Sequence, residues 1–410
     1  MDLQGWDWVT INVPYGDTFR KHTTYQHRFM NSPETLKYCD VQVAETRKML
    51  AKILNSPGEY EQHVKRLPGT VVILNIYGHR VEKDDKYVEL GRQAVRYAAE
   101  SKQYFYLDVI PWLRYFPEWV PFVKFQGVAR EARKVAQALR FNLYELTKKR
   151  IADGAAEKSM TSIFLAENTQ NDGSVLGEPE FCAAAATLFN GGVDTTATAI
   201  MAFVLYMLQN PDAQRCAQQE IDQVVGTERL PTFEDEENLP YTRAICEEIL
   251  RIAVITPLAM PHSSTSDDVY KGYRIPVGTT VLANVWQMSR DEHLFEDPSS
   301  FKPERWLPDS KYSNKKSQLR APRPRDFAFG FGRRICPGQK WAEQLLFIAV
   351  ASMLAALNIE KAVDENGREI EPNNEYLQSF VRTLGSSKCK ITPRSRIIAD
   401  IISASVENAS

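Results

Sequence analysis

The residues with the clearest chemical potential lie near the C-terminus, where one cysteine stands among glycines and arginines. The stretch from Phe329 to Gly338 reads FGFGRRICPG. Glycines before the cysteine let the backbone approach a flat ligand closely. Gly338 and the start of the apolar segment after it can direct N–H groups at the sulfur of Cys336, which lowers the pKa of the thiol. We expect a thiolate that holds a metal or a cofactor; the alternative is a buried structural cysteine in a turn.

A second group of reactive residues lies in the middle of the chain, in the sequence NGGVDTT from Asn190 to Thr196. Two adjacent glycines inside a helix cost roughly 1 kcal/mol each relative to alanine, so they need a reason. Gly191 and Gly192 would leave room for a bulky ligand. Asp194 and Thr195 then offer an acid and a hydroxyl beside that opening, as proton delivery requires. The alternative is a helix contact through small residues, which leaves Asp194 unexplained.

A third pattern consists of charged residues. Glu248 and Arg251 stand three positions apart, on one face of a predicted helix. Most such pairs are solvated surface contacts of little energetic weight. Arg305, in the sequence FKPERW, could join them in a buried network.

These residues need elements that hold them in place. Apolar spacing of three and four predicts helices over 34–54, 84–101 and 127–150, and a long helix over 181–208. That last segment is long enough to cross a membrane, but the charge of Asp194 at its centre favours a helix through a soluble core. Residues 167–177 read as a surface loop, and 267–284 alternate like a hairpin. We therefore expect a mainly α fold with a small β subdomain, forming a single domain over residues 1–410.

Two stretches allow more than one interpretation. Residues 105–122 combine seven aromatic residues with three prolines, which predicts a loop that covers a cavity or touches a membrane surface; an ordinary connection packed on the core is the alternative. Residues 311–325 carry six basic residues and no acid, so they could dock an acidic partner, form a nucleic-acid patch or form a solvated loop.

Composition excludes several classes of protein. The chain has 410 residues, of which 43% are hydrophobic, with 50 basic and 52 acidic side chains. This balance argues against a disordered chain and against a polycation that binds nucleic acid. The six cysteines are scattered, without the paired spacing of a disulfide framework or a zinc site. We expect reduced thiols and a protein that faces the cytosol.

Taken together, the cysteine loop, the segment from Gly192 to Thr196 and the charged set resemble the cytochrome P450 superfamily of haem-thiolate monooxygenases. The three patterns occur in that family's order, and the resemblance covers nearly the whole chain. Pro261-His262 and Tyr15-Gly16-Asp17 are similar to fungal membrane-associated members that act in secondary metabolism, including those akin to O-methylsterigmatocystin oxidoreductase.

The resemblance implies a role for each matching residue. Cys336 would be the axial thiolate of haem b (iron protoporphyrin IX), with Phe329 shielding the sulfur and Gly338 beside it. Arg334, His262 and His22 would contact the haem propionates. Asp194 and Thr195 would carry protons during oxygen activation, while Glu248, Arg251 and Arg305 would hold the proximal core. Where members usually carry a tryptophan and an arginine, this chain has Phe19 and Thr23, so one propionate contact is lost or passes to Arg20 or His22.

The family also implies partners and a location. Electrons would come from NADPH-cytochrome P450 reductase, the substrate would be small and hydrophobic, and no nucleic acid would take part. Substrate contacts would include 181–189, 256–260 and 378–381. Full-length members lie on the cytosolic face of the endoplasmic reticulum membrane.

The N-terminal residues modify the expected fold and activity. Residues 1–14 read as neither a signal peptide nor an anchor, so we expect a chain that lacks the N-terminal portion of the fold and could be soluble. A haem-binding but catalytically impaired remnant is therefore the alternative function, and a membrane protein with a structural cysteine is the third.

Overall fold

The computed structural model describes residues 2–30, 36–82, 85–104, 106–117, 119–120, 124–307, 321–377 and 381–407. Within them the chain forms two compact units, which we describe separately. Unit 1 consists of Met1–Val41 with Arg66–Asp194, and unit 2 of Gln42–Lys65 with Thr195–Ser410. Three helices begin in one unit and end in the other, namely α2 (Leu36–Asn55), α3 (Tyr60–Tyr77) and α8 (Glu178–Gln209).

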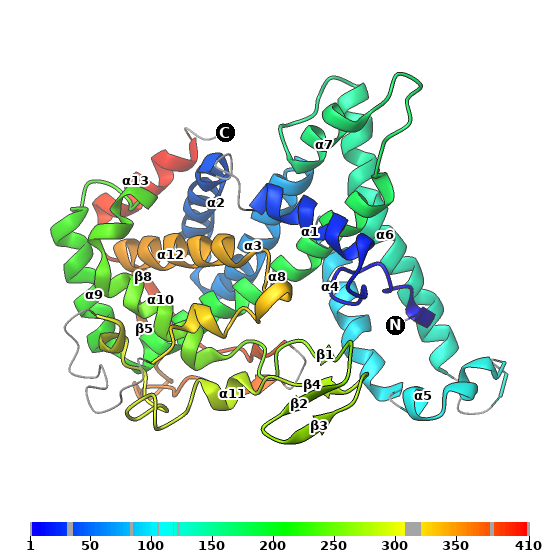
Figure 1. Ribbon diagram of the computed structural model, residues 1–410. Coiled ribbons are helices and arrows are strands. Elements are labelled where there is room, and N and C mark those ends of the chain that lie inside the picture. Colours follow the sequence, from blue (N-terminus) through cyan, green and yellow to red (C-terminus); the bar gives the residue numbers. More distant parts are fainter. Residues whose placement is uncertain are drawn as a thin grey trace. The chain divides into compact units, whose positions relative to one another are not determined.

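Unit 1 is built from helices (Figure 1). Besides its parts of the shared helices, it contains η1 (Asp2–Gln4), α1 (Asp17–Met30), α4 (Lys86–Glu100), η4 (Ser101–Tyr104), α5 (Tyr106–Val109), η5 (Pro111–Tyr115), α6 (Phe125–Ala152) and α7 (Met160–Asn168), where η marks a 3-10 helix. α7 begins at a reciprocal cap, because the Ser159 hydroxyl accepts from the Ser162 backbone and the Ser162 hydroxyl accepts from the Ser159 backbone. Its Phe164 ring stacks on Phe181 of α8 with centroids 3.8 Å apart, so aromatic packing fixes the start of α8.

Unit 2 contains the remaining helices around α12, which is buried along most of its length. They are η3 (Pro57–Glu59), α9 (Pro211–Val224), η6 (Phe233–Asn238), α10 (Pro240–Ala253), α11 (Val285–Met288), η7 (Pro303–Trp306), η8 (Pro324–Asp326), η9 (Gly332–Arg334), α12 (Gln339–Ala356) and α13 (Arg396–Glu407). α12 packs against α9 and α10, as Figure 1 shows. Proline at the first position of α9 and of α10 suits a helix start, since its missing N–H has no helical partner there.

The strands form four antiparallel pairs, all in unit 2. β1 (His262–Ser263) pairs with β4 (Thr280–Val281), and β2 (Asp268–Tyr270) with β3 (Tyr273–Ile275). β5 (Leu357–Lys361) pairs with β8 (Cys389–Pro393), and β6 (Tyr376–Leu377) with β7 (Thr383–Leu384). The hairpin predicted over 267–284 therefore extends only to Ile275; the next strand pairs with His262–Ser263, a partner too far along the chain for alternation to reveal.

The predicted helices are present with shifted ends, and the mainly α fold with small sheets is confirmed. Among the described residues one helix, α8, is long and apolar enough to cross a membrane, and most of its apolar stretch is buried inside the protein. Three aromatic residues of the predicted covering loop are exposed, Trp112 at 60%, Tyr115 at 73% and Trp119 at 82%, whereas Tyr106 and Phe116 are half-buried. Phe105, Pro121 and Phe122 lie outside the described residues.

The basic stretch is described only at its C-terminal end, because residues 311–320 lie outside the described part. Arg323 pairs with Glu247, and Arg325 pairs with Glu343 at 2.8 Å. These two arginines have acidic partners within unit 2, so they neutralise charges of the same protein. A docking role would depend on the four residues Lys311, Lys315, Lys316 and Arg320.

Candidate active site

Cys336 sits in a tight loop between η9 and α12. Its backbone N–H donates to the Phe329 carbonyl at 2.8 Å, which closes the loop, and its own carbonyl accepts from Gln339 at 3.3 Å as α12 begins. Gly330 and Gly332 have φ of +84° and +58°, a backbone conformation that L residues rarely adopt. At Gly338 a Cβ would lie 4.0 Å from the sulfur, so a longer side chain would crowd it. The glycines therefore shape the loop and keep the space beside the sulfur free.

The thiol of Cys336 does not have the depressed pKa that the sequence predicts. The residue is exposed, yet crowding by protein around the sulfur raises the pKa of the thiol above its ordinary value. The backbone N–H of Gly338 acts in the expected direction and lowers it, but burial is the larger cause. The prediction was wrong because it considered the N–H donors near the sulfur but not the desolvation of the Cys336 thiol by the surrounding protein. A bound metal cation would supply the missing stabilisation and deprotonate the thiol.

A hydrophobic cluster lies beneath this loop. It has a buried centre of Val254, Ala259, Val285, Phe295 and Phe327, and half-buried members that include Ala328 and Phe331 of the cysteine loop. The loop is thus packed against the turn that follows α10. Phe329, expected to shield the sulfur, is half-buried.

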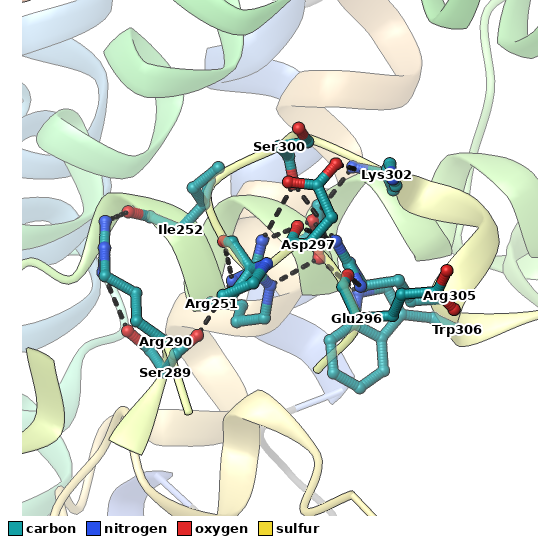
Figure 2. A network of polar contacts seen from close by, with 12 residues as sticks. Arg251, Ile252, Ser289, Arg290, Glu296, Asp297, Ser300, Lys302, Arg305 and Trp306 are labelled. Carbon is teal, nitrogen blue, oxygen red and sulfur yellow. Dashed lines mark hydrogen bonds and ion pairs between the residues drawn. The ribbon is translucent and has the colours of Figure 1, made fainter. Parts of the chain in front are cut away.

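The three charged residues predicted to form a network lie together in unit 2. Glu248 accepts from Arg251 at 2.9 and 2.7 Å and from Nε of Arg305 at 3.3 Å, and the side chains of Glu248 and Arg251 are fully buried. Figure 2 shows that backbone carbonyls accept the remaining guanidinium N–H groups. The acceptors for Arg251 belong to Ser289, Pro298 and Ser300, and those for Arg305 include Asp297. Buried charges are tolerated when their donors have partners, and here every guanidinium nitrogen of Arg251 and Arg305 has at least one acceptor.

The two glycines of α8 have different roles. A Cβ on Gly192 would lie 2.7 Å from Cγ2 of Val72 on α3, so this glycine permits a close helix contact. A Cβ on Gly191 would meet nothing within 4 Å, so this position faces open space. The helix contact through small residues therefore holds for Gly192, and room for a ligand at Gly191 stays a prediction. Asp194 and Thr195 follow in the same helix and are half-buried.

Comparison with known proteins agrees with this arrangement. The family model described as "Cytochrome P450" matches residues 11–384. The chain belongs to the cytochrome P450 family. A curated relative, cytochrome P450 monooxygenase claR of Ampulloclitocybe clavipes, is 37% identical over 98% of this chain and 74% of its own length. A cytochrome P450 monooxygenase of Armillaria gallica is 34% identical over 98% of this chain and 78% of its own length. The chain is accordingly a cytochrome P450 monooxygenase.

Solved structures show the same fold. A zebra fish cytochrome P450 with progesterone superimposes with a TM-score of 0.75 at 20% identity, covering 96% of this chain and 86% of the other. The same protein with abiraterone gives 0.71. At this identity the likeness concerns the fold.

The family carries a haem-thiolate cofactor, and the residues of the cysteine loop fit one. Cys336 as a residue is exposed, on a loop whose glycine at 332 leaves open space, since a Cβ there would meet nothing within 4 Å. Arg334, two residues before the cysteine, is half-buried, and burial lowers the pKa of its guanidinium. A sulfur ligand, free space and a nearby cation suit an anionic iron porphyrin.

The two histidines expected at the propionates have different surroundings. His262 lies in β1 and is half-buried. His22 lies on α1 in unit 1, where Nδ1 is 3.2 Å from Oγ1 of Thr10. Burial and the charge of Arg140 lower the pKa of His22 to about 4, so the ring is neutral at pH 7. A neutral ring can still donate one N–H, and the propionate role of both residues stays a prediction. Arg20, the other substitute considered, pairs with Asp17 at the exposed surface of α1.

Sequence reasoning missed residues that complete the site. Trp306 Nε1 donates to Oε2 of Glu248 at 2.9 Å, adding a fourth partner to the network. The signal was its place directly after Arg305. Arg290 and Arg382 were also missed; they donate to the last carbonyls of α10, and no local pattern marks them.

Proposed function

We propose that this cytochrome P450 monooxygenase holds haem b through Cys336 as the axial thiolate and hydroxylates a small hydrophobic substrate. The observation that supports this most strongly is the exposed cysteine in a loop closed by the bond from Cys336 to Phe329 and shaped by left-handed glycines. Arg334 and His262, with His22, would contact the propionates. When bound, haem supplies the activation of dioxygen and the transfer of one oxygen atom to the substrate.

The residues of α8 would supply protons. The Thr195 hydroxyl would donate a proton from Oγ1 to the reacting dioxygen, and the Asp194 carboxyl would restore it. Each turnover consumes the substrate R–H, dioxygen, two electrons and two protons, and yields R–OH and water. The open face at Gly191 supports a place for the reaction beside this pair.

The source of the electrons and the location are part of the proposal. NADPH-cytochrome P450 reductase would deliver the electrons, and fungal secondary metabolism would be the setting; the relatives reported above are fungal monooxygenases. Exposed Trp112, Tyr115 and Trp119 support contact with a membrane surface, which for this family would be the cytosolic face of the endoplasmic reticulum.

Spectroscopy tests the cofactor assignment. Reduced protein treated with carbon monoxide should show the red-shifted Soret band of a thiolate-bound haem. Cys336→Ser should abolish the band, whereas Cys216→Ser, at an exposed cysteine of α9, should leave it unchanged. A persistent band in folded Cys336→Ser protein would remove Cys336 as the ligand.

A coupling measurement tests the proton relay. In Thr195→Ala, more of the consumed NADPH should yield peroxide and less should yield product, because the hydroxyl donor is gone. Thr195→Ser retains the hydroxyl and should restore coupling. Equal coupling in all three proteins would exclude Thr195 from proton delivery. NADPH consumption without product in the wild type, with every candidate substrate, would favour the impaired alternative.

A further inference from the structure

The turn that follows α10, residues 254–261, has a strained backbone. Val254 and Ala259 have φ of 39° and 50°, and both are buried. Left-handed backbone is disfavoured for any residue with a Cβ, and most of all for a β-branched one such as valine. Such strain persists only where the surrounding structure enforces it, and it tends to occur at functional sites. The contacts that enforce this turn are therefore of interest.

Three residues from elsewhere in unit 2 bind the carbonyls at the end of α10 and in the turn. Arg382 donates from its backbone N to the Ile255 carbonyl at 2.8 Å and from Nη1 to the Ala253 carbonyl at 2.9 Å. Arg290 donates to the Ile252 carbonyl at 2.9 Å, a contact visible in Figure 2. The Trp286 backbone N–H donates to the Pro257 carbonyl at 2.9 Å. Carbonyls left without helical partners at a C-terminus favour cationic donors of this kind.

The side chains of the same residues stack on one another. The Arg290 guanidinium carbon lies 3.4 Å from the centre of the Trp286 ring, and that of Arg382 lies 4.7 Å from it. Arg382 also lies 3.6 Å from the centre of the Tyr376 ring on β6. Among the residues that the structure describes, neither arginine forms an ion pair with an acid. Aromatic ring faces and backbone carbonyls are the partners of both arginines instead. The planar guanidinium of arginine fits such partners, whereas the ammonium of lysine does not.

Arg382 binds a segment that the family resemblance assigns to the substrate pocket, the turn that contains 256–260. It directly follows Val381, the only described residue of the segment 378–381, which the resemblance assigns to the pocket as well. The turn leads to His262, and its Val254 and Ala259 pack in the same hydrophobic cluster as Phe327, just before the cysteine loop, and Phe331 of that loop. A change at Arg382 would thus reach both the predicted pocket and the loop of Cys336.

We infer that Arg382, stacked on Trp286 and Tyr376, is a positioning residue that fixes the strained turn 254–261 and thereby the shape of the substrate pocket. The part that concerns the pocket rests on the proposed function; the part that concerns the turn does not. Arg382 would touch neither substrate nor haem.

Hydrogen exchange tests the turn without reference to haem. In Arg382→Lys, which retains the charge but loses the flat fork, peptides covering 254–262 should exchange about tenfold faster than in the wild type. Arg394→Lys is the matched control. Arg394 is also half-buried in unit 2 and forms two bonds, of 2.8 and 2.6 Å, with Asp222. The Arg394→Lys substitution should leave the hydrogen exchange of peptides covering 254–262 unchanged. Unchanged exchange in Arg382→Lys, or equal acceleration in both variants, would overturn the inference.

Ligand binding to the holoprotein tests the effect on the pocket. The Soret shift gives dissociation constants for imidazole, a small probe, and for 4-phenylimidazole, a bulky one. In Arg382→Lys the ratio of the two constants should change about fivefold, while Arg394→Lys keeps the wild-type ratio. An unchanged ratio despite faster exchange would overturn the link to the pocket. A wild-type protein without the carbon monoxide band would refute the proposed function, and exchange would still decide the role of Arg382.

A second variant covers the case in which Arg382→Lys does not fold. Trp286→Leu removes the ring that both guanidiniums contact and retains the backbone N–H that binds the Pro257 carbonyl. It should accelerate exchange in the same peptides. If neither variant folds while Arg394→Lys does, the stack is a general requirement for folding and the specific positioning role is refuted.

Discussion

Two buried polar clusters, one in each unit, give their groups different partners. In unit 2, Glu248 and Arg251 form an ion pair with no exposure of either side chain. In unit 1, His22 is 2% exposed and neutral. The difference lies in the partners. Glu248 faces two guanidiniums, an indole N–H and the backbone N–H of Lys302, whereas His22 faces the Thr10 hydroxyl and the positive charge of Arg140. Burial is the main cause of the lowered pKa of His22, and Arg140 adds to it, whereas hydrogen-bond donors surround the buried carboxyl oxygens of Glu248.

The largest effect should come from removing the centre of the charged cluster. Glu248→Ala leaves two buried guanidiniums without their carboxylate, which should cost about 3–5 kcal/mol of unfolding free energy. Urea titration followed by circular dichroism measures it. Glu360→Ala, at an exposed pair with Lys390, should cost less than about 1 kcal/mol. Equal losses in the two variants would contradict the view that Glu248 holds buried charges.

Acid should destabilise the neutral cluster. The pKa of His22 is about 4 when folded and 6.5 when unfolded, so between these values the unfolded chain binds more protons. Its contribution to stability is full above pH 6.5 and is lost as the pH falls toward 4. From pH 7 to pH 5 the wild type should lose about 2 kcal/mol more than His22→Gln, measured by urea titration at both values. The same loss in both proteins would show that His22 is not the responsible group.

A smaller effect is expected from the fourth partner of Glu248. Trp306→Phe retains the ring and removes the Nε1 donor to Oε2, which should cost about 1.5–3 kcal/mol because the acceptor is charged. Trp112→Phe, at an exposed tryptophan, should lie within about 0.5 kcal/mol of the wild type. Thermal unfolding of the two variants and of the wild type measures these losses of stability. A loss no greater than that of the control would mean that the guanidiniums alone satisfy Glu248.

The smallest effect should come from a neutral partner. Thr10→Val removes the hydroxyl that contacts His22 Nδ1 and accepts from Gln26 Nε2 at 3.0 Å, at a cost of about 1 kcal/mol. Thr24→Val, at an exposed threonine of α1 whose hydroxyl donates to the Arg20 carbonyl, is the control. If Thr10→Val cost more than Trp306→Phe, the contrast between charged and neutral clusters would fail.

The sequence predicts partners that are near in the chain better than those brought close by folding. The spacing of Glu248 and Arg251 places both on one helix face, and FKPERW places Arg305 as their companion. The carbonyls of Ser289, Pro298 and Ser300 that complete the network follow from loop paths that no periodicity reveals. The stack of Arg290, Trp286 and Arg382 is likewise assembled from two distant segments, one that contains Trp286 and Arg290 and one that contains Arg382.

Cys336 and the two glycines of α8 show the same limit of prediction from sequence. The sequence identifies Cys336 and the N–H of Gly338, but the net direction of the thiol pKa depends on how much water the folded loop excludes. It identifies Gly191 and Gly192 as unusual, yet their separate reasons appear only when α3 is beside α8. The sequence identifies the reactive groups, but it does not show which parts of the folded protein surround them.

The contact between Gly192 and Val72 has a consequence for laboratory evolution of this enzyme. A library that varies Gly191 alone should yield many folded members, because a new side chain there enters open space. At Gly192 a larger residue would be accepted only together with a smaller residue at position 72, which a single-site library does not contain. Searches for altered substrate range are therefore best served by varying 72 and 192 jointly and 191 freely.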